Sequence, residues 1–213
     1  RVTTRPPAGV SAGPTVPVSK RGERALDALS GRAEVIAEVR VLHLDADVFV
    51  RDVPEIWDVI IADFPDPSTP DVAKLFSLEF YQQVARRLAP DGVLVVQAGS
   101  PYTNRRAFWA VADTLEATGL GTTALWAHVP TFGAWGWLLA ARGPAPRPRG
   151  TPPFDTRYLD AAVLVAAQVF PRPLGHPDGG PAVSTRLDPQ VMRLYGAGEP
   201  LEGLTPFRGS ARR

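Results

Sequence analysis

The chain has 213 residues, and 45% of them are hydrophobic, which suffices for one folded domain with a core. Its 23 basic and 22 acidic residues leave a net charge of +1, so no global field favours nucleic acid or an anionic membrane. Cysteine is absent and only three histidines occur, which excludes disulfides and thiolate metal sites and disfavours a His-rich metal site. Proline and glycine concentrate near both ends and at residues 143–153, so we expect the core between residues 26 and 141.

The two ends differ from the middle in composition. Residues 1–22 combine Pro, Gly, Ser and Thr without periodicity, which predicts a disordered or low-complexity tail. Residues 23–142 are expected to form a partial α/β domain. Residues 143–213 are expected to be a linker, an amphipathic helix over residues 155–170, and an irregular extension with a short helix at residues 189–195. No apolar stretch approaches the roughly 20 residues that a membrane helix needs.

Strand and helix patterns alternate through the middle of the chain. Residues 39–44 (V-R-V-L-H-L) alternate apolar with polar side chains, which predicts a strand. Residues 57–62 (W-D-V-I-I-A) are nearly all apolar, which predicts a central strand covered on both faces. The further predicted elements are a helix over residues 72–88, a strand over 93–97, a helix over 105–118, and strands over 122–129 and 135–141. This alternation predicts an α/β fold with a mostly parallel sheet.

Two aspartates follow the predicted strand over residues 57–62, at the end of a sheet where α/β folds bind ligands. Asp63 and Asp66 lie in the loop D-F-P-D-P-S-T-P, whose prolines leave the backbone little freedom. Like charges held close together resist joint ionisation, so the pair favours a metal or a cationic ligand such as an amine. No third carboxylate or histidine nearby supports a metal. The spacing also allows these aspartates merely to cap the helix over residues 72–88 and to terminate a turn.

Polar residues also follow the neighbouring predicted strands. Asp45 comes after the strand over residues 39–44, where an acid commonly accepts a hydrogen bond from adenine or ribose in nucleotide-binding folds. A solvated loop is an equally good interpretation of Asp45 alone. Gln97 ends the strand over residues 93–97 and can donate and accept hydrogen bonds in the same crevice.

These features, in this order, resemble the spermidine synthase (polyamine aminopropyltransferase) family. The family pattern is a D-x-x-D-P-x-x-P loop, a leucine and aromatic pair, F-Y, a helix, D-G, and a strand that ends in Gln, and residues 57–101 carry all of it. The resemblance covers about residues 39–141. The phrases V-P-T-F-G-A-W-G-W and L-D-A-A-V-L-V-A-A-Q-V-F-P-R further resemble bacterial membrane-type spermidine synthase-like proteins. The family resemblance implies a Rossmann-like, mostly parallel sheet of the S-adenosylmethionine-dependent methyltransferase type.

The resemblance implies an amine site made of four residues. Asp63 matches the catalytic acid/base group, and Asp63 and Asp66 match the polyamine-binding stretch. Gln97 matches a glutamine that faces the polyamine. Phe132 stands where the family usually has a tyrosine, so a hydroxyl is missing there.

The resemblance implies a nucleoside site made of three residues. Asp45 and Ala46 match the Asp-Gly pair that holds the adenine of decarboxylated S-adenosylmethionine, with Ala in place of Gly. Pro70 matches the proline that lines the thioadenosine product. Decarboxylated S-adenosylmethionine is thus the implied co-substrate, and no prosthetic group or metal is expected.

Two family features have no counterpart in this sequence. They are a glycine-rich loop after the first strand and an acid at the end of the second. Without its first strands a parallel sheet exposes a strand edge and loses much of its cofactor pocket. We therefore expect the C-terminal portion of a longer enzyme. The resemblance implies a cytoplasmic homo-oligomer, anchored to the membrane if the full-length protein has a membrane-spanning upstream half.

The implied function is transfer of an aminopropyl group to a diamine such as putrescine. One alternative is an S-adenosylmethionine-dependent methyltransferase, because D-F-P loosely resembles the acidic loop of amino-methylating enzymes. The second Asp-Pro step, at Asp66 and Pro67, disfavours it. Another alternative is a non-catalytic remnant of the fold, which the missing first strands and Phe132 favour.

Overall fold

The computed structural model describes residues 41–151 and 156–197. The chain divides into two compact units, Arg1–Asp45 and Ala46–Arg213. The tail expected at residues 1–22 lies outside the described residues. Within the described part, no helix is both long enough and apolar enough to cross a membrane.

Residues 41–45 are the described part of the first unit, and they form neither helix nor strand. The strand predicted over residues 39–44 is therefore wrong at residues 41–44, while residues 39 and 40 are outside the described range. Val41 and Leu44 are 52% and 64% exposed. An alternating pattern makes a strand only where a neighbouring strand accepts its hydrogen bonds, and the described sheet contains strands of the second unit alone.

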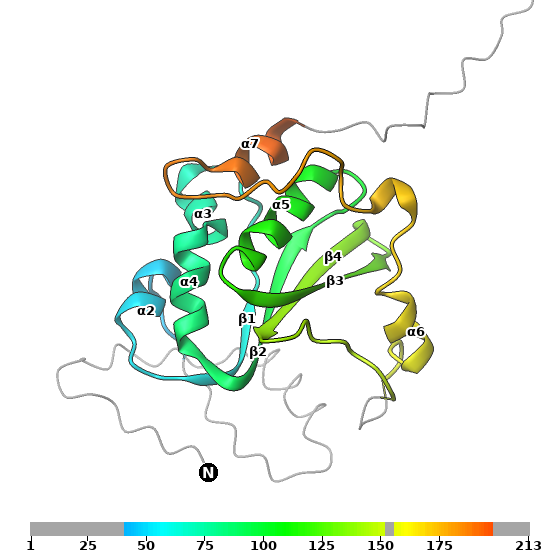
Figure 1. The fold of residues 1–213 in the computed structure, drawn as a ribbon, viewed down its shortest axis with the longest axis horizontal. Helices are drawn as coiled ribbons and strands as arrows, with labels where there is room; N and C mark the ends of the chain where they lie inside the picture. The colour runs from blue at the N-terminus through cyan, green and yellow to red at the C-terminus, as the bar shows by residue number, and fades with distance from the viewer. Residues whose placement is uncertain (1–40, 152–155, 198–213) are drawn as a thin grey trace, which may run out of the picture. The chain divides into compact units, whose positions relative to one another are not determined.

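The described sheet of the second unit has four strands in the spatial order β1-β2-β4-β3 (Figure 1). Their bounds are Trp57–Ala62 for β1, Leu88–Gly99 for β2, Leu120–Val129 for β3 and Gly133–Arg142 for β4. β1 and β2 are parallel, whereas β4 is antiparallel to both of its neighbours. The register places Ile61 beside Val95, and Val95 beside Leu139. The α/β, Rossmann-like class is confirmed, and the described sheet is mixed because a tight hairpin joins β3 to β4.

β1 lies at one edge of the described sheet, so the prediction of a central strand is wrong for these residues. Val59 and Ile61 are 60% and 72% exposed, whereas Ala62 is 4% exposed. Side chains alternate between the two faces of a strand, which explains why neighbours differ so strongly. The apolar composition of β1 suggested a strand buried on both faces, but one of its faces is exposed.

The single helix predicted over residues 72–88 is interrupted at Ser77. Its pieces are α3 (Pro70–Ala73), the 3-10 turn η1 (Lys74–Phe76) and α4 (Leu78–Arg87). Ser77 has extended backbone angles, and its hydroxyl accepts a hydrogen bond from the Phe80 backbone N–H at 3.3 Å. It therefore begins a new helix by N-capping it, a local signal that the hydrophobic spacing hides.

Two more helices flank these elements. α2 (Ala46–Asp52) precedes β1, and α5 (Arg105–Glu116) confirms the helix predicted over residues 105–118, two residues shorter. Gly119 follows α5 with a φ of +87°, the left-handed conformation expected after a helix C-cap.

The C-terminal part contains less helix than predicted. Only Ala161–Ala166 (α6) is helical within the helix predicted over residues 155–170, so that prediction is wrong for most of its described length. Just after α6, the Ala167 carbonyl accepts a hydrogen bond from the Trp126 backbone N–H, and the Val169 carbonyl accepts one from Trp126 Nε1. Both carbonyls thus bind β3 instead of continuing the helix. The turn η2 (Arg172–Leu174) and α7 (Gln190–Ala197) follow, and α7 confirms the short helix predicted at residues 189–195.

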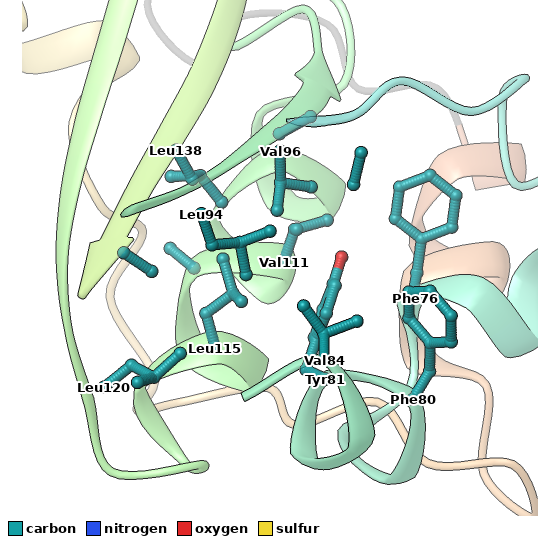
Figure 2. Close-up of a cluster of buried hydrophobic side chains, with 14 of the residues drawn as sticks. Phe76, Phe80, Tyr81, Val84, Leu94, Val96, Val111, Leu115, Leu120 and Leu138 are labelled. Atoms are coloured by element: carbon teal, nitrogen blue, oxygen red, sulfur yellow. The ribbon is translucent and has the colours of Figure 1, made fainter. Parts of the chain in front are cut away.

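The core lies between one face of the sheet and the helices α4 and α5. Alternate residues of the central strands point into it, and Figure 2 shows Leu94, Val96 and Leu138 meeting side chains from the two helices. The largest fully buried helix residues drawn there are Phe80, Tyr81, Val84, Val111 and Leu115. This packing fixes the ends of β1 and β2, from which the polar loops depart.

Candidate active site

The loop of residues 63–70 leaves the end of β1 with its two acids turned outward. Asp63 and Asp66 are exposed, whereas Pro67 between the loop and the core is buried. The Ser68 N–H donates to the Asp66 carbonyl at 2.7 Å, which closes a tight turn. The buried Pro67 and the fixed φ angles of all three loop prolines thus hold both carboxylates at the surface on a stiff frame.

An aromatic side chain anchors this loop to the core. Phe64 packs edge-on against Phe76 and Phe80, with ring centroids 6.1 and 5.7 Å apart. Because Phe64 directly follows Asp63, its fixed ring also fixes the backbone that carries Asp63. Aromatic pairs of this geometry stabilise a fold by about 0.5–1.5 kcal/mol beyond their burial.

Capping does not account for the two aspartates. The residue that caps α3 is Thr69 and the residue that caps α4 is Ser77. Neither Asp63 nor Asp66 is the N-cap of either helix, so the capping alternative does not hold.

Gln97 connects the loop with the β3–β4 hairpin. With its amide oriented to satisfy both neighbours, Gln97 donates to the Phe64 carbonyl and accepts from Trp135 Nε1, both at 3.1 Å. The ring of Phe132 packs on Trp135 at 5.2 Å and is itself 66% exposed. Gln97 and Phe132, far apart in sequence, thus lie on one connected cluster through Trp135.

A small cavity brings Asp66 and Gln97 together. Its volume of about 10 Å³ is room for about one water molecule. Asp66, Gln97 and Tyr195 are among the residues that line it, together with the apolar Phe76 and Val191. The cavity therefore joins the end of β2, the acidic loop and α7.

Tyr195 is a site residue that sequence reasoning missed. Its side chain and Asp66 line the same cavity, although the two residues are far apart in the chain. Burial, followed by the hydrogen bond and the negative charge of Asp66, raises the pKa of Tyr195 to about 12. The phenol is therefore neutral at physiological pH and acts as the donor. A helical pattern at residues 189–195 was visible in the sequence, but no local signal connects it with the loop.

The residues expected to bind the nucleoside come from separate parts of the chain. Ala46 begins α2 and is half-buried, and Pro70 begins α3 and is exposed. Asp45 belongs to the first unit. Neither Ala46 nor Pro70 lines the cavity beside Asp66.

A second acid near the predicted nucleoside residues has a structural partner instead. Asp47 is 6% exposed, and its Oδ1 accepts a hydrogen bond from Arg186 Nη2 at 2.5 Å. Arg186 also donates its backbone N–H to Glu79 at 3.1 Å. This pair fastens the C-terminal segment to α2 and α4. Among the described residues, no three Asp, Glu or His side chains gather as a cation site.

Comparisons with known proteins agree on one family. The sequence profile of the spermine/spermidine synthase domain matches residues 33–147. Polyamine aminopropyltransferase 1 of Streptomyces coelicolor is 44% identical over 157 residues, which cover 72% of this chain and 29% of the relative. Polyamine aminopropyltransferase 2 of Ralstonia nicotianae is 40% identical over 176 residues, covering 80% and 33%. The chain thus spans about a third of the length of these curated relatives.

Solved structures show the same fold. A spermidine synthase in complex with the transition state analogue AdoDATO superposes with a TM-score of 0.56 and 23% identity, covering 71% of this chain and 52% of that one. The spermidine synthase from Thermotoga maritima gives a TM-score of 0.53, also at 23% identity, and covers 71% and 51%. At this identity the likeness concerns the arrangement of helices and strands.

Proposed function

Because this chain belongs to the spermine/spermidine synthase domain family, we propose that it supplies the amine site of a polyamine aminopropyltransferase. The reaction is transfer of the aminopropyl group of decarboxylated S-adenosylmethionine to a diamine such as putrescine. The observation that carries the proposal is the shared site of Asp66 and Gln97, next to the exposed Asp63, at the carboxyl ends of β1 and β2. That edge of an α/β sheet is where ligands bind.

Asp63 is the proposed proton acceptor. A primary ammonium has a pKa of roughly 10, so at neutral pH the amine must lose a proton before it can attack. The nitrogen then forms a bond to the methylene next to the sulfonium, and the carbon–sulfur bond breaks. Its electron pair stays on sulfur, which leaves neutral methylthioadenosine, while the proton goes to the Asp63 carboxylate.

Electrostatics explains why two acids suit this reaction. Both reactants are cationic, so they repel each other unless negative charge lies close to them. Asp66, which lines a cavity with Gln97, is the proposed partner of the distal ammonium of a diamine, and Asp63 is the proposed partner of the attacking nitrogen. The remaining requirement is in-line positioning of the two reactants.

The proposed nucleoside-binding residues of this chain are Asp45, Ala46 and Pro70. Asp45 and Ala46 are the proposed adenine contacts, and Pro70 is the proposed neighbour of the thioadenosine. A cytoplasmic location, a homo-oligomer and a membrane-spanning upstream half remain predictions. Sedimentation velocity of the purified chain tests the homo-oligomer: a mass of one chain at all concentrations would contradict it.

Incubation of the full-length protein that contains these 213 residues with putrescine and decarboxylated S-adenosylmethionine tests the function. We expect methylthioadenosine to form, and we expect Asp63→Asn to lower kcat by about 10²–10⁴-fold, the usual contribution of a general base. Asp71→Asn is the matched control, because Asp71 is an exposed acid in the first turn of α3. Formation of methylthioadenosine at the same rate by Asp63→Asn and the wild type would refute the role of Asp63.

A non-catalytic remnant is the second candidate function. The observation that favours it is the exposed face of β1 at Val59 and Ile61, which lacks cover in the described part of the chain. Calorimetric titration with methylthioadenosine and putrescine separates the two candidates. Binding of both ligands supports the enzyme, and binding of neither supports the remnant.

A further inference from the structure

Helix α7 is held firmly against the rest of the second unit. It packs on α5, as Figure 1 shows, and Val191 near its start is buried in the core with 1% exposure. The Val191 N–H donates to the Ser184 hydroxyl at 3.3 Å. Further along, Asn104 Nδ2 donates to the Tyr195 carbonyl at 3.2 Å when its amide is oriented to satisfy its neighbours. The backbone of Tyr195 is therefore fixed beside the acidic loop.

The side chain of Tyr195 reaches the exposed end of that loop. Tyr195 and Asp66 line the same small cavity as Gln97, and the negative charge of Asp66 contributes to the raised pKa of the Tyr195 hydroxyl. A carboxylate has about four acceptor positions, so one phenol hydrogen bond leaves Asp66 free to accept more from an ammonium. The phenol thus restricts the rotation of the Asp66 side chain without occupying all of its acceptor positions.

Phe132 lacks the hydroxyl of the tyrosine that the family usually has at this position, so another residue has to supply a hydroxyl if the site uses one. The Phe132 ring packs on Trp135, and Trp135 donates to Gln97, so Phe132 belongs to the same cluster as Gln97. Tyr195, on α7, carries a phenol hydroxyl and lines the same cavity as Gln97. In the proposed reaction, Asp66 binds the distal ammonium and Asp63 takes the proton of the attacking nitrogen.

We propose that Tyr195 is a positioning residue of the amine site, whose hydroxyl orients the Asp66 carboxylate toward the distal ammonium of a diamine. This inference rests on the proposed function and adds a determinant of acceptor preference to it. A monoamine has no distal ammonium, so the contribution of Tyr195 is restricted to diamines.

Tyr195→Phe removes the hydroxyl and keeps the ring that closes the cavity. With putrescine as acceptor, we expect KM to rise about tenfold, which corresponds to one hydrogen bond to a charged group, with kcat unchanged. With butylamine, which is putrescine without its second amine, kcat/KM should be the same in variant and wild type. Tyr158→Phe is the matched control, since Tyr158 is 64% exposed and does not line the cavity.

The Asp66→Asn background supplies a second readout. If Tyr195 acts through Asp66, Tyr195→Phe has no further effect on KM for putrescine in that background. An additional tenfold rise there would overturn the inference. An unchanged KM for putrescine in the Tyr195→Phe single variant would also overturn the inference. An equal loss of kcat/KM with butylamine would overturn it too, because it would mean that Tyr195 has a general structural role.

Calorimetric titration with putrescine keeps this inference separate from the proposed function. If the wild type binds putrescine but forms no methylthioadenosine, the proposed function fails, and a tenfold weaker Kd in Tyr195→Phe still supports the inference. If transfer occurs and Tyr195→Phe binds putrescine as tightly as the wild type, the inference fails and the function stands. No binding of putrescine by the wild type would overturn both.

Discussion

Gly136 on β4 lies against the ring of Phe108, and the contact leaves no room for a side chain. A Cβ built on Gly136 would lie 2.4 Å from Phe108 Cε2. Phe108 is fully buried between Trp109 and Phe170, with ring centroids 5.2 and 5.9 Å away, so the ring cannot withdraw. We expect Gly136→Ala to lower the free energy of unfolding by about 1–3 kcal/mol, measured by urea titration.

The same substitution in α7 is the control. A Cβ on Gly196 meets no atom within 4 Å, and alanine is the better helix former, so Gly196→Ala should raise the free energy of unfolding by up to about 1 kcal/mol. Equal effects of the two substitutions would contradict the close packing at Gly136.

Tyr81 is another residue whose side chain is constrained by the core. It is fully buried, burial raises its pKa well above the usual range of a phenol, and its hydroxyl has no hydrogen-bond partner among the described residues. An unpaired buried hydroxyl costs about 1–3 kcal/mol. We therefore expect Tyr81→Phe to leave the free energy of unfolding unchanged or to raise it by about 1 kcal/mol in a urea titration. A clear loss of stability would reveal a partner for the hydroxyl.

At the scale of elements, side-chain hydrogen bonds fasten the segment of residues 171–197 to α5. Arg105 Nε donates to the Gly175 carbonyl at 2.6 Å, and Trp109 Nε1 donates to the Leu174 carbonyl at 2.9 Å. Asp113, buried on α5, accepts from the Ala182 N–H at 2.7 Å and contacts His176 Nε2 at 2.8 Å. These contacts hold in place the segment that carries Tyr195.

The His176 contact makes this attachment depend on pH. Partial burial lowers the pKa of His176, but the Asp113 hydrogen bond, the Pro177 carbonyl and the charges of Asp113 and Glu116 together raise it above its ordinary value. Protonated His176 is therefore favoured in the folded state. Its stabilising contribution is fully present below about pH 6.5, the ordinary pKa, and is lost as the pH rises through the raised value.

Urea titrations at pH 5.5 and at pH 8.5 check this linkage. Between the two values, the wild type should lose more unfolding free energy than His176→Asn, which cannot titrate. Using this difference cancels the other groups that titrate in the same range. A variant that loses as much as the wild type would show that His176 makes no pH-dependent contribution.

At the scale of the whole molecule, the distinctive feature is β1, which lies at an edge of the sheet in the described part of the chain and has exposed apolar side chains there. Unpaired strand edges with apolar side chains favour association with other chains. We expect Ile61→Lys, at a side chain that is 72% exposed, to reduce self-association in sedimentation velocity without loss of folding. Ile60→Lys, on the opposite face and packed against the core, should instead unfold the protein. Similar unfolding by both substitutions would mean that Ile61 is covered in solution.

Local patterns in the sequence were sufficient for β1, β2, α5, the β3–β4 hairpin and α7, because hydrophobic periodicity, turn residues and Gly119 act over short distances. They failed at Ser77, where a single hydroxyl caps a new helix, and at residues 155–170, where α6 is short and Trp126 binds the carbonyls of Ala167 and Val169 just after it. They also failed at residues 41–44 and in the placing of β1, since pairing and burial depend on which strands are neighbours.

By itself, the sequence determined the α/β class, the family, and the positions of Asp63, Asp66 and Gln97 at the ends of strands. The order of the motifs was enough, because the carboxyl ends of parallel strands meet at one edge of a sheet. Only the tertiary structure decided that Trp135 links Gln97 to Phe132, that Asp47 pairs with Arg186, and that Tyr195 lines a cavity with Asp66. Those contacts join segments far apart in the chain, and no local preference encodes them.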